Sequence, residues 1–383
     1  MKKLHYIGYC FADGEADCYQ CNVASNLKMH YIVDAAKRAG YDTVLYSLCK
    51  TTKKFQKGVK TEGDSGTIRH IASFGSNSFV FRLLNLFLFY FQLIAYILFR
   101  VKKNDDVLLY HSVRVTKIVS RLLKLKKARF ILEVEEIYAC SADGIQNYYQ
   151  KEIKNILKFK YFIFVNDFLP QHLNVESDKY IVVYGSYRAA IKEVAPFEDD
   201  KIHVLYAGAI ETLNKGAFTA IEVASYLPDN YKMHILGKGL DCDVQAANNR
   251  IQEINNRLGV DKVRYEGFYS GEALDNFMCK CQIGIGTYKI KDNYSNFIFP
   301  SKLLSYMCHN LKVVTGRSTC YERAEIAKDW FLYDTDEYAT IARAIVEAGE
   351  SRCAVDSSLL IQQLDVRLVT SFENMFKKRI WVE

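Results

Sequence analysis

Strand-like apolar runs alternate with helical patterns along nearly all of the chain, and this alternation restricts the fold more than any other feature of the sequence. In the first half, apolar runs at residues 4–9, 43–48, 107–110 and 129–134 are separated by segments with helical spacing. Strands that alternate with helices form parallel sheets with helices on both faces. The sequence therefore predicts an α/β protein built from doubly wound, Rossmann-like sheets.

The alternation stops at a polar stretch, residues 196–200, and then begins again. A length of 383 residues suits two domains, at about 150 residues for each domain. We therefore expect an N-terminal domain over 1–197, a C-terminal domain over 198–356, and a final helix at 357–383 that packs back across both. Two such domains facing each other leave a cleft at the carboxyl ends of both sheets, where doubly wound folds bind ligands.

Two strand-loop-helix units in the second half carry the residues of a phosphate site. Gly208 ends an apolar strand, and Lys215 stands just before the helix that follows. Ser301 and Lys302 stand at the start of another helix, directly after Pro300. Free N–H groups at a helix start attract anions, and a lysine adds positive charge. Taken alone, each unit is equally well explained as an ordinary turn with a solvated lysine.

Four segments of the second half occur in one order and spacing: VLYAGAIETLNKG at 204–216, HILGKG at 234–239, VRYEGF at 263–268 and FPSKLLSYMCHNLKVVTG at 299–316. Together they resemble the donor-binding half of glycosyltransferases with the GT-B fold, in the family 4 group of retaining enzymes. The resemblance covers about residues 200–330. The first half resembles these enzymes only in its pattern of strands and helices.

The resemblance implies a glycosyltransferase that moves a sugar from a nucleotide-sugar donor to a saccharide or lipid-linked saccharide acceptor, with retention of configuration, in cell-surface polysaccharide synthesis. It implies two Rossmann-like domains facing across a cleft, with the donor on the C-terminal domain and the acceptor on the N-terminal one. In such enzymes lysines and the start of a helix replace a metal ion at the diphosphate, so we expect no metal. We also expect no cofactor, because the nucleotide sugar is a substrate. The implied donor-binding residues are Gly208, Lys215, Gly237, Tyr265, Gly267, Asn296, Ser301, Lys302 and Ser305.

The sequence departs from the family pattern at three positions. The family commonly has Arg after the strand-end glycine, where this chain has Ala209, and it usually carries two Glu where this chain has Phe297 and Ser305. In place of the second Glu, a Ser hydroxyl makes only a single, weaker contact to a ribose. Two alternatives therefore stay open: a nucleotide-sugar epimerase on the same fold, and a non-catalytic subunit that binds a nucleotide sugar or glycan beside a partner enzyme.

Polar residues follow two further predicted strands of the first half. Gly14 and Glu15 follow the first strand, and Arg114 comes shortly after His111, which closes the run at 107–110. Because the carboxyl ends of parallel strands meet at one edge of a sheet, these loops should face the same ligand. We expect Gly14, Glu15 and Arg114 on the acceptor side.

Three carboxylates, Glu133, Glu135 and Glu136, stand within four residues at the end of the strand at 129–134. Such a cluster is costly without a cationic or hydroxyl partner. A carboxylate or imidazole at the cleft can polarise an acceptor hydroxyl or stabilise a developing oxocarbenium ion. The candidate catalytic residues are therefore Glu135, which we prefer, with Glu136 and His111; each is otherwise a hydrogen-bonded group at a strand end.

Cysteine usage gives no metal site. The 11 Cys are odd in number, and neither Cys18-x-x-Cys21 nor Cys279-x-Cys281 has a second pair at zinc-finger spacing. No signal-peptide pattern opens the sequence. We therefore expect reduced thiols in a cytoplasmic protein.

The most apolar segment, residues 79–99, carries Arg82, Asn85 and Gln92 at spacings of three and seven, so these three polar residues share one helical face. One interpretation is a helix buried between two strands. The other is a helix lying in the lipid headgroup region, with the basic cluster at 100–103 on anionic lipid. A true membrane span is disfavoured, because a strand follows at once.

The net charge of +7 and the pI of about 8.7 suit an anionic small substrate, a membrane surface or a nucleic acid. A nucleic-acid role is disfavoured, because the basic residues are interspersed with nearly as many acidic ones and no binding motif is present. The expected partners are therefore the nucleotide sugar, the acceptor and, through residues 79–103, the inner face of the plasma membrane.

Overall fold

The computed structural model describes residues 2–12, 14–20, 23–63, 66–76, 78–140, 146–190, 192–212, 216–288, 290, 296–352 and 356–378. The chain divides into two compact units, unit 1 with Met1–Ser186 and Asp365–Glu383, and unit 2 with Tyr187–Leu364. The sequence placed the change of domain near residue 197, whereas the chain enters unit 2 at Tyr187. The reason is local: Ala190 donates its N–H to the carbonyl oxygen of Cys308 and accepts the thiol of Cys279, both in unit 2.

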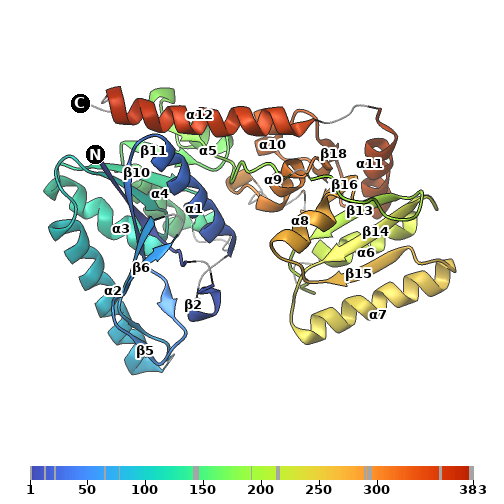
Figure 1. Ribbon diagram of the computed structural model, residues 1–383, viewed down its shortest axis with the longest axis horizontal. Helices are drawn as coiled ribbons and strands as arrows, with labels where there is room; N and C mark the ends of the chain where they lie inside the picture. The colour runs from blue at the N-terminus through green and yellow to red at the C-terminus, as the bar shows by residue number, and fades with distance from the viewer. Residues whose placement is uncertain are drawn as a thin grey trace. The chain divides into compact units, whose positions relative to one another are not determined.

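Unit 1 is built on an eight-stranded sheet in the order β12-β11-β10-β9-β1-β3-β7-β6, and among these described strands only β6 and β7 pair antiparallel. Figure 1 labels three of its strands, β6, β10 and β11. The strands are β1 Lys3–Gly8, β3 Asp42–Ser47, β6 Lys60–Gly63, β7 Gly66–His70, β9 Asp106–Tyr110, β10 Arg129–Val134, β11 Tyr161–Phe164 and β12 Tyr180–Val182. Two short antiparallel pairs stand beside this sheet, β2 Tyr19–Gln20 with β4 Lys50–Thr51, and β5 Phe55–Gln56 with β8 Ser73–Phe74. The helices of unit 1 are α1 Val23–Arg38, α2 Phe79–Phe99, α3 Val113–Leu122, α4 Gln146–Ile156 and α5 Phe168–His172.

The central strands of unit 1 are buried on both faces. All four residues of β11 and all but one residue in each of β9 and β10 are buried. Continuous apolar strands of this kind are typical of parallel sheets covered by helices on both sides. The α/β prediction for the first half is confirmed.

The helix α12, Ser357–Lys378, joins unit 1 from Asp365 onward. Arg38 donates to both carboxylate oxygens of Asp365, at 2.7 and 2.8 Å, and the Tyr31 hydroxyl donates to the same group at 2.7 Å. Phe372 is fully buried and lies edge-to-face against Tyr41. The last turns of this helix are therefore part of the fold of unit 1.

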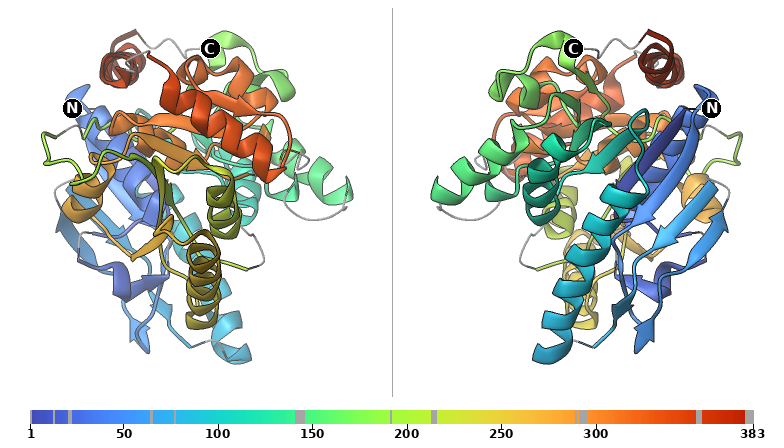
Figure 2. Two further views of the ribbon diagram at one scale, coloured as in Figure 1. Left: turned by 90° about the vertical axis from the view of Figure 1, so that its right-hand side faces the viewer. Right: turned by 90° about the vertical axis from the view of Figure 1, so that its left-hand side faces the viewer.

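The helix α2 packs on unit 1 through polar side chains. Asn85 exchanges two hydrogen bonds with the backbone of Phe74, and Gln92 exchanges two with the backbone of Ala72, at 2.7 to 3.0 Å. In an extended strand the backbone N–H and carbonyl groups of successive residues point to opposite sides. Those of residues 72 and 74 therefore point to the same side, toward α2. The pattern predicted one face for Arg82, Asn85 and Gln92; the two amides do lie together against unit 1, whereas Arg82 is exposed. Figure 2 shows α2 in cyan along the side of unit 1.

Unit 2 is built on a six-stranded, fully parallel sheet in the order β15-β14-β13-β16-β17-β18. Numbered along the unit, this is the 3-2-1-4-5-6 order of Rossmann folds. The strands are β13 Ile202–Ala207, β14 Tyr231–Leu236, β15 Val263–Gly267, β16 Ile283–Gly286, β17 Lys312–Gly316 and β18 Phe331–Tyr333. The helices are α6 Gly216–Val223, α7 Asp241–Leu258, α8 Glu272–Met278, α9 Ser301–Cys308, α10 Thr319–Arg323, α11 Tyr338–Glu350 and the start of α12.

Candidate functional site

The order of the strands in unit 2 identifies where a ligand would bind. β13 and β16 are neighbours, but the chain leaves β13 toward β14 and leaves β16 toward β17 on the opposite side. At such a topological switch point the two loops separate and open a crevice at the carboxyl ends of the strands. Gly208 follows β13 directly, and α9 is the helix that follows β16.

Lys302, the second residue of α9, places its ammonium group at this switch point. Its Nζ lies 4.3 Å from the centre of the Tyr206 ring and 5.2 Å from that of Tyr288. A cation over aromatic faces is stabilised without a counter-ion. Desolvation lowers the pKa of Lys302 to about 8. Among the described residues no carboxylate pairs with it, so this half-buried charge is available to an anion.

Two glycines of β16 bring α9 close to the sheet. A Cβ on Gly284 would stand 2.2 Å from the Tyr306 ring, and a Cβ on Gly286 would stand 2.5 Å from the side chain of Leu303. The Tyr306 hydroxyl, which is buried, accepts the N–H of Ala207 at 2.9 Å and donates to the carbonyl oxygen of Ile285. This close packing fixes the helix that carries Lys302 against the end of β13.

The loops after β13, β14 and β15 are tied together by glycines. Gly237 donates its N–H to the carbonyl oxygen of Gly267 at 2.9 Å, and Tyr265 donates its hydroxyl to the carbonyl oxygen of Gly237 at 2.9 Å. Gly267 has a φ of +88°, which glycine adopts without strain. The N–H of Gly208 is used as well, because it donates to Leu236. Gly208 thus makes room for the Lys302 ammonium group and contributes no hydrogen-bond donor.

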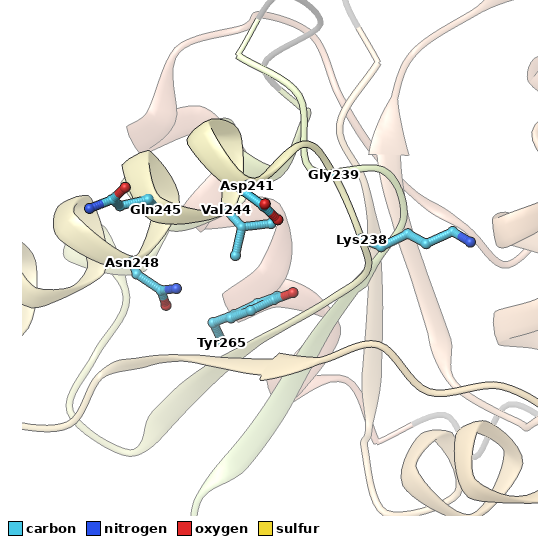
Figure 3. A pocket seen from close by; sticks show the side chains of 7 residues that line it. All are labelled: Lys238, Gly239, Asp241, Val244, Gln245, Asn248 and Tyr265. Carbon is cyan, nitrogen blue, oxygen red and sulfur yellow. The ribbon is translucent and has the colours of Figure 1, made fainter.

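A cavity of about 420 Å³ lies beside these loops, between the start of α7 and β15 (Figure 3). The ring of Tyr265 lies below Val244 with Asn248 beside it, while the side chain of Lys238 extends away from them. The residues that line the cavity are Lys238, Gly239, Asp241, Val244, Gln245, Asn248 and Tyr265. An aromatic face with an amide beside it suits a flat polar ring such as a nucleobase.

Of the predicted donor-binding residues, Gly208 and Lys302 lie together at the switch point, and Gly237, Tyr265 and Gly267 form the neighbouring loops. Lys215 lies outside the described residues.

The remaining three predicted donor-binding residues lie on or next to α9. Ser301 is exposed as the first residue of the helix. Asn296 accepts hydrogen bonds from the Ser318 hydroxyl and the Cys320 N–H, so its carbonyl oxygen is occupied within unit 2. The Ser305 hydroxyl lies 3.7 Å from the sulfur of Met278. The structure therefore gives Ser305 an internal contact at the position where the family usually has a ribose-binding Glu.

A second cluster of ionisable groups lies at the switch point of unit 1, between β1 and β9 and beside β10. Lys28 of α1 lies 2.5 Å from a carboxylate oxygen of Glu135 and 3.9 Å from one of Glu133, and it donates to the carbonyl oxygen of Val183 at 2.7 Å. The hydroxyl of Tyr6 donates to Glu133. Burial of Glu133 and the nearby charge of Glu135 raise the pKa of Glu133 to about 8. One lysine thus faces two carboxyl groups, and burial favours the protonated form of Glu133.

The geometry does not favour His111 as an acid or base. Its ring is buried, with Nδ1 2.6 Å from the Thr116 hydroxyl and Nε2 2.8 Å from a carboxylate oxygen of Glu152. Glu152 also accepts the N–H groups of Tyr138 and Ala139. Both ring nitrogens are therefore engaged in holding α3, α4 and the loop after β10 together, and His111 is a structural residue here.

The other predicted residues of unit 1 lie in loops or in the first turn of a helix and range from half-buried to exposed. Gly14 has a φ of +81°, and Glu15 accepts the N–H of Ala12 and lies 3.5 Å from Nε2 of His70. Arg114 is exposed in the first turn of α3. Glu136 is half-buried and hydrogen-bonds with Tyr138, whose pKa is raised by burial and by this carboxylate.

Four residues of these two clusters were not predicted as site residues: Tyr206 and Tyr288 around Lys302, and Tyr6 and Lys28 around the glutamates. The sequence could have indicated Tyr206, because residues two apart in a strand share a face and Tyr206 precedes Gly208 by two. Lys28 had a weaker one, a charge within an otherwise apolar stripe of α1. Within the described ranges, no group of three or more His, Cys, Asp and Glu residues is arranged to hold a metal ion.

No family model matches the sequence, and no curated protein matches it. Solved structures do match the fold. Sucrose-phosphate synthase from Thermosynechococcus elongatus aligns with a TM-score of 0.73 at 12% identity over 100% of both chains. HepE from Anabaena in complex with UDP aligns with a TM-score of 0.66 at 12% identity over 99% of both. A structure described as trehalose-6-phosphate from E. coli bound with UDP-2-fluoro glucose aligns with a TM-score of 0.68 at 10% identity over 99% of both. These similarities confirm the predicted fold class, the GT-B fold with its two Rossmann-like domains.

Proposed function

We propose that this chain is a glycosyltransferase that moves a sugar from a nucleotide-sugar donor to a saccharide or lipid-linked saccharide acceptor. The observation that carries the proposal is the ammonium group of Lys302, half-buried at the switch point of unit 2 and paired with no carboxylate among the described residues. A desolvated cation at the end of a parallel sheet binds a phosphate group strongly, because little water competes for it.

The donor is a nucleoside diphosphate sugar. The diphosphate lies at Lys302 and at the first N–H groups of α9, which have no partners within the helix. The nucleobase takes the cavity at Tyr265 and Asn248. Solved structures of the same fold contain UDP or a UDP sugar, which supports uridine as the first nucleoside to test.

In the reaction, the bond between the anomeric carbon and the phosphate oxygen breaks and an acceptor oxygen bonds to that carbon. The nucleoside diphosphate leaves with the electron pair, and the acceptor hydroxyl gives its proton to the departing phosphate oxygen. Lys302 and the start of α9 neutralise the charge that develops on the leaving group. We propose that the transfer proceeds with retention, without a metal ion, and in the synthesis of a cell-surface polysaccharide. Glu135, with Glu136 beside it, is the proposed acceptor-side carboxylate, and Lys28 holds it in place.

The test begins with a thermal-shift screen of the full chain against nucleoside diphosphates and their sugars, because a ligand that binds the native state raises its melting temperature. The best donor is then incubated with membrane extracts as acceptors, and transferred sugar is measured. Lys302→Met should weaken nucleoside diphosphate binding by about tenfold to a hundredfold, while Lys328→Met, an exposed lysine of the same unit, should leave it unchanged. Equal binding by both variants would overturn the proposal.

A second candidate is a non-catalytic subunit that binds the nucleotide sugar. The contact of the Ser305 hydroxyl with Met278 favours it, because this position contributes no carboxylate to a ribose. Donor binding without transfer, unchanged by Glu135→Gln, would identify this role. Conversion of the donor without any acceptor, followed by NMR, would instead identify an epimerase.

A further inference from the structure

The helix α2 exposes its apolar side and buries its polar side. The exposed apolar face consists of Phe79, Val80, Leu83, Leu84, Phe87 and Phe91, whose exposed fractions run from 39% to 73%. The described residues contain one helix long and apolar enough to cross a membrane, and it is this one, with only 17% of its most apolar window buried. A soluble helix normally has the reverse arrangement, so this surface calls for an apolar or interfacial environment.

The helix does not lie free to cross a bilayer. Its amide side chains Asn85 and Gln92 are bonded to the backbone beside β8, and Leu93, Tyr96 and Ile97 are buried in unit 1. Directly after it, β9 pairs in parallel with β1 and β10 inside the sheet. Inserting α2 across a membrane would break these contacts, whereas a helix that lies flat on a surface keeps all of them.

A group of basic side chains, which we call the basic rim, adjoins the first turns of α2: Lys53, Lys54, Lys57 and Arg82. All four are exposed and none forms an ion pair among the described residues. Aromatic contacts link them to the helix. Phe55 lies among the three lysines, its ring is 4.6 Å from that of Phe74, and Phe74 is 4.9 Å from Phe81 of α2. The rim and the apolar face are therefore one continuous surface.

The charge around this surface has one sign. Residues 50–61 contain five basic and no acidic residues, and residues 73–104 contain four basic and no acidic residues. Arg100, Lys102 and Lys103 stand at the far end of α2, about 30 Å from its start at 1.5 Å per residue. A second copy of the chain on this face would bring the two basic rims together by symmetry, and like charges repel. An anionic lipid surface offers both an apolar layer and the opposite charge.

We propose that unit 1 binds an anionic membrane surface with α2 lying flat, its apolar face inserted at the headgroup level and the basic rim on the lipid phosphates. This inference stands apart from the proposed sugar transfer, because it needs neither the donor nor turnover. It also gives the protein a place where a lipid-linked molecule would be within reach.

The test is co-sedimentation of the full chain with vesicles of phosphatidylglycerol and phosphatidylcholine, and with vesicles of phosphatidylcholine alone. Binding should require the anionic lipid and fall as salt rises. Phe87→Glu with Phe91→Glu should reduce binding at least tenfold, whereas Val366→Glu, an exposed apolar residue of α12, should not. Lys53→Glu with Lys54→Glu should also reduce it at least tenfold, at about fivefold for each charge lost near the surface. The matched charge change Lys328→Glu with Arg352→Glu should leave binding unchanged.

Three results would overturn the proposal. The first is equal binding by the face, rim and control variants. The second is a protein that leaves the vesicles only with detergent, which would mean that α2 spans the bilayer. The third is a dimer in solution that Phe87→Glu with Phe91→Glu dissociates without any change in vesicle binding. The melting temperature of every variant without ligand shows whether its fold remains intact.

Discussion

Lys302 holds its ammonium group against Gly208, so close that a Cβ atom on residue 208 would stand 2.9 Å from Nζ. Gly237 also lies against Gly208, and a Cβ atom there would come within 1.7 Å of the carbonyl oxygen of residue 208. The end of a lysine side chain can move aside, but a backbone carbonyl cannot. Gly208 therefore leaves room for the ammonium group of Lys302. Gly237 allows the loops after β13 and β14 to contact each other.

Replacing these two glycines should separate binding from stability. Gly208→Ala should weaken UDP binding about tenfold, because the displaced Lys302 loses a charge-assisted contact, and should leave the melting temperature nearly unchanged. Gly237→Ala should destabilise unit 2 by more than about 2 kcal/mol, because its Cβ overlaps backbone. Calorimetric titration with UDP and thermal unfolding measure the two effects. A stable Gly237→Ala would show that the loops separate readily.

The affinity for UDP should fall as the pH rises from 7 to 9.5. Burial lowers the pKa of Lys302 to about 8 in the free protein, so the lysine loses its charge in this range. The charge of the UDP diphosphate does not change in this range, because the second ionisation of a phosphate lies at about pH 6. Lys302→Arg should bind UDP with a flat pH profile, since a guanidinium stays charged. A wild-type profile as flat as that of Lys302→Arg would place the diphosphate elsewhere.

Glu133 should make the protein less stable as the pH rises. Its pKa is raised in the folded state, from an ordinary value of 4.5 to about 8, by burial and by Glu135. The native state therefore holds a proton that the unfolded chain has released, and the stability present below pH 4.5 is lost between about pH 4.5 and 8. Glu133→Gln keeps the acceptor for Tyr6 without the titration.

The measurement is the difference in melting temperature between pH 6 and pH 8. It should be smaller for Glu133→Gln than for the wild type, by about 2–4 °C for each 1 kcal/mol removed. Glu253→Gln, at an exposed position, serves as the control. If Glu133→Gln retained the full wild-type slope, the carboxyl group would be ionised in the native state.

The amide of Gln92 should protect the backbone of Ala72. In Gln92→Leu the N–H and carbonyl of residue 72 lose their partners, at a cost of about 2 kcal/mol. Exchange of the Ala72 amide hydrogen should then accelerate about 30-fold. Gln362→Leu, an exposed position of α12, should leave that rate unchanged. Slow exchange in Gln92→Leu would mean that other contacts hold the helix in place.

The alternating pattern predicted the elements well, because strands such as β9 and β13 are short apolar runs between helices with clear apolar stripes. It also brought Gly208 and Lys302 to one site, because in a parallel sheet all loops after strands meet at one edge. Their exact surroundings depended on contacts between distant segments. Nothing local to Lys302 indicates that Tyr206 and Tyr288 flank its ammonium group.

The glutamate cluster shows the same limit. Three carboxylates in four residues implied a cationic partner, but Lys28 lies 107 residues away from Glu135 and comes from another helix. The sequence also directed attention to the basic residues after α2. The sequence did not predict that Lys53, Lys54 and Lys57 lie beside the start of α2, because the pairing of β5 with β8 brings them there.

The pairing of Asn85 and Gln92 with residues 72 and 74 has a consequence for how the chain behaves among its neighbours. Without α2, the backbone N–H and carbonyl groups of residues 72 and 74 would be open to pairing with a strand of another molecule. In this protein the side-chain amides of Asn85 and Gln92 form the hydrogen bonds that a neighbouring strand would otherwise form with these groups. The helix thus covers a sheet edge that another strand would otherwise be able to extend.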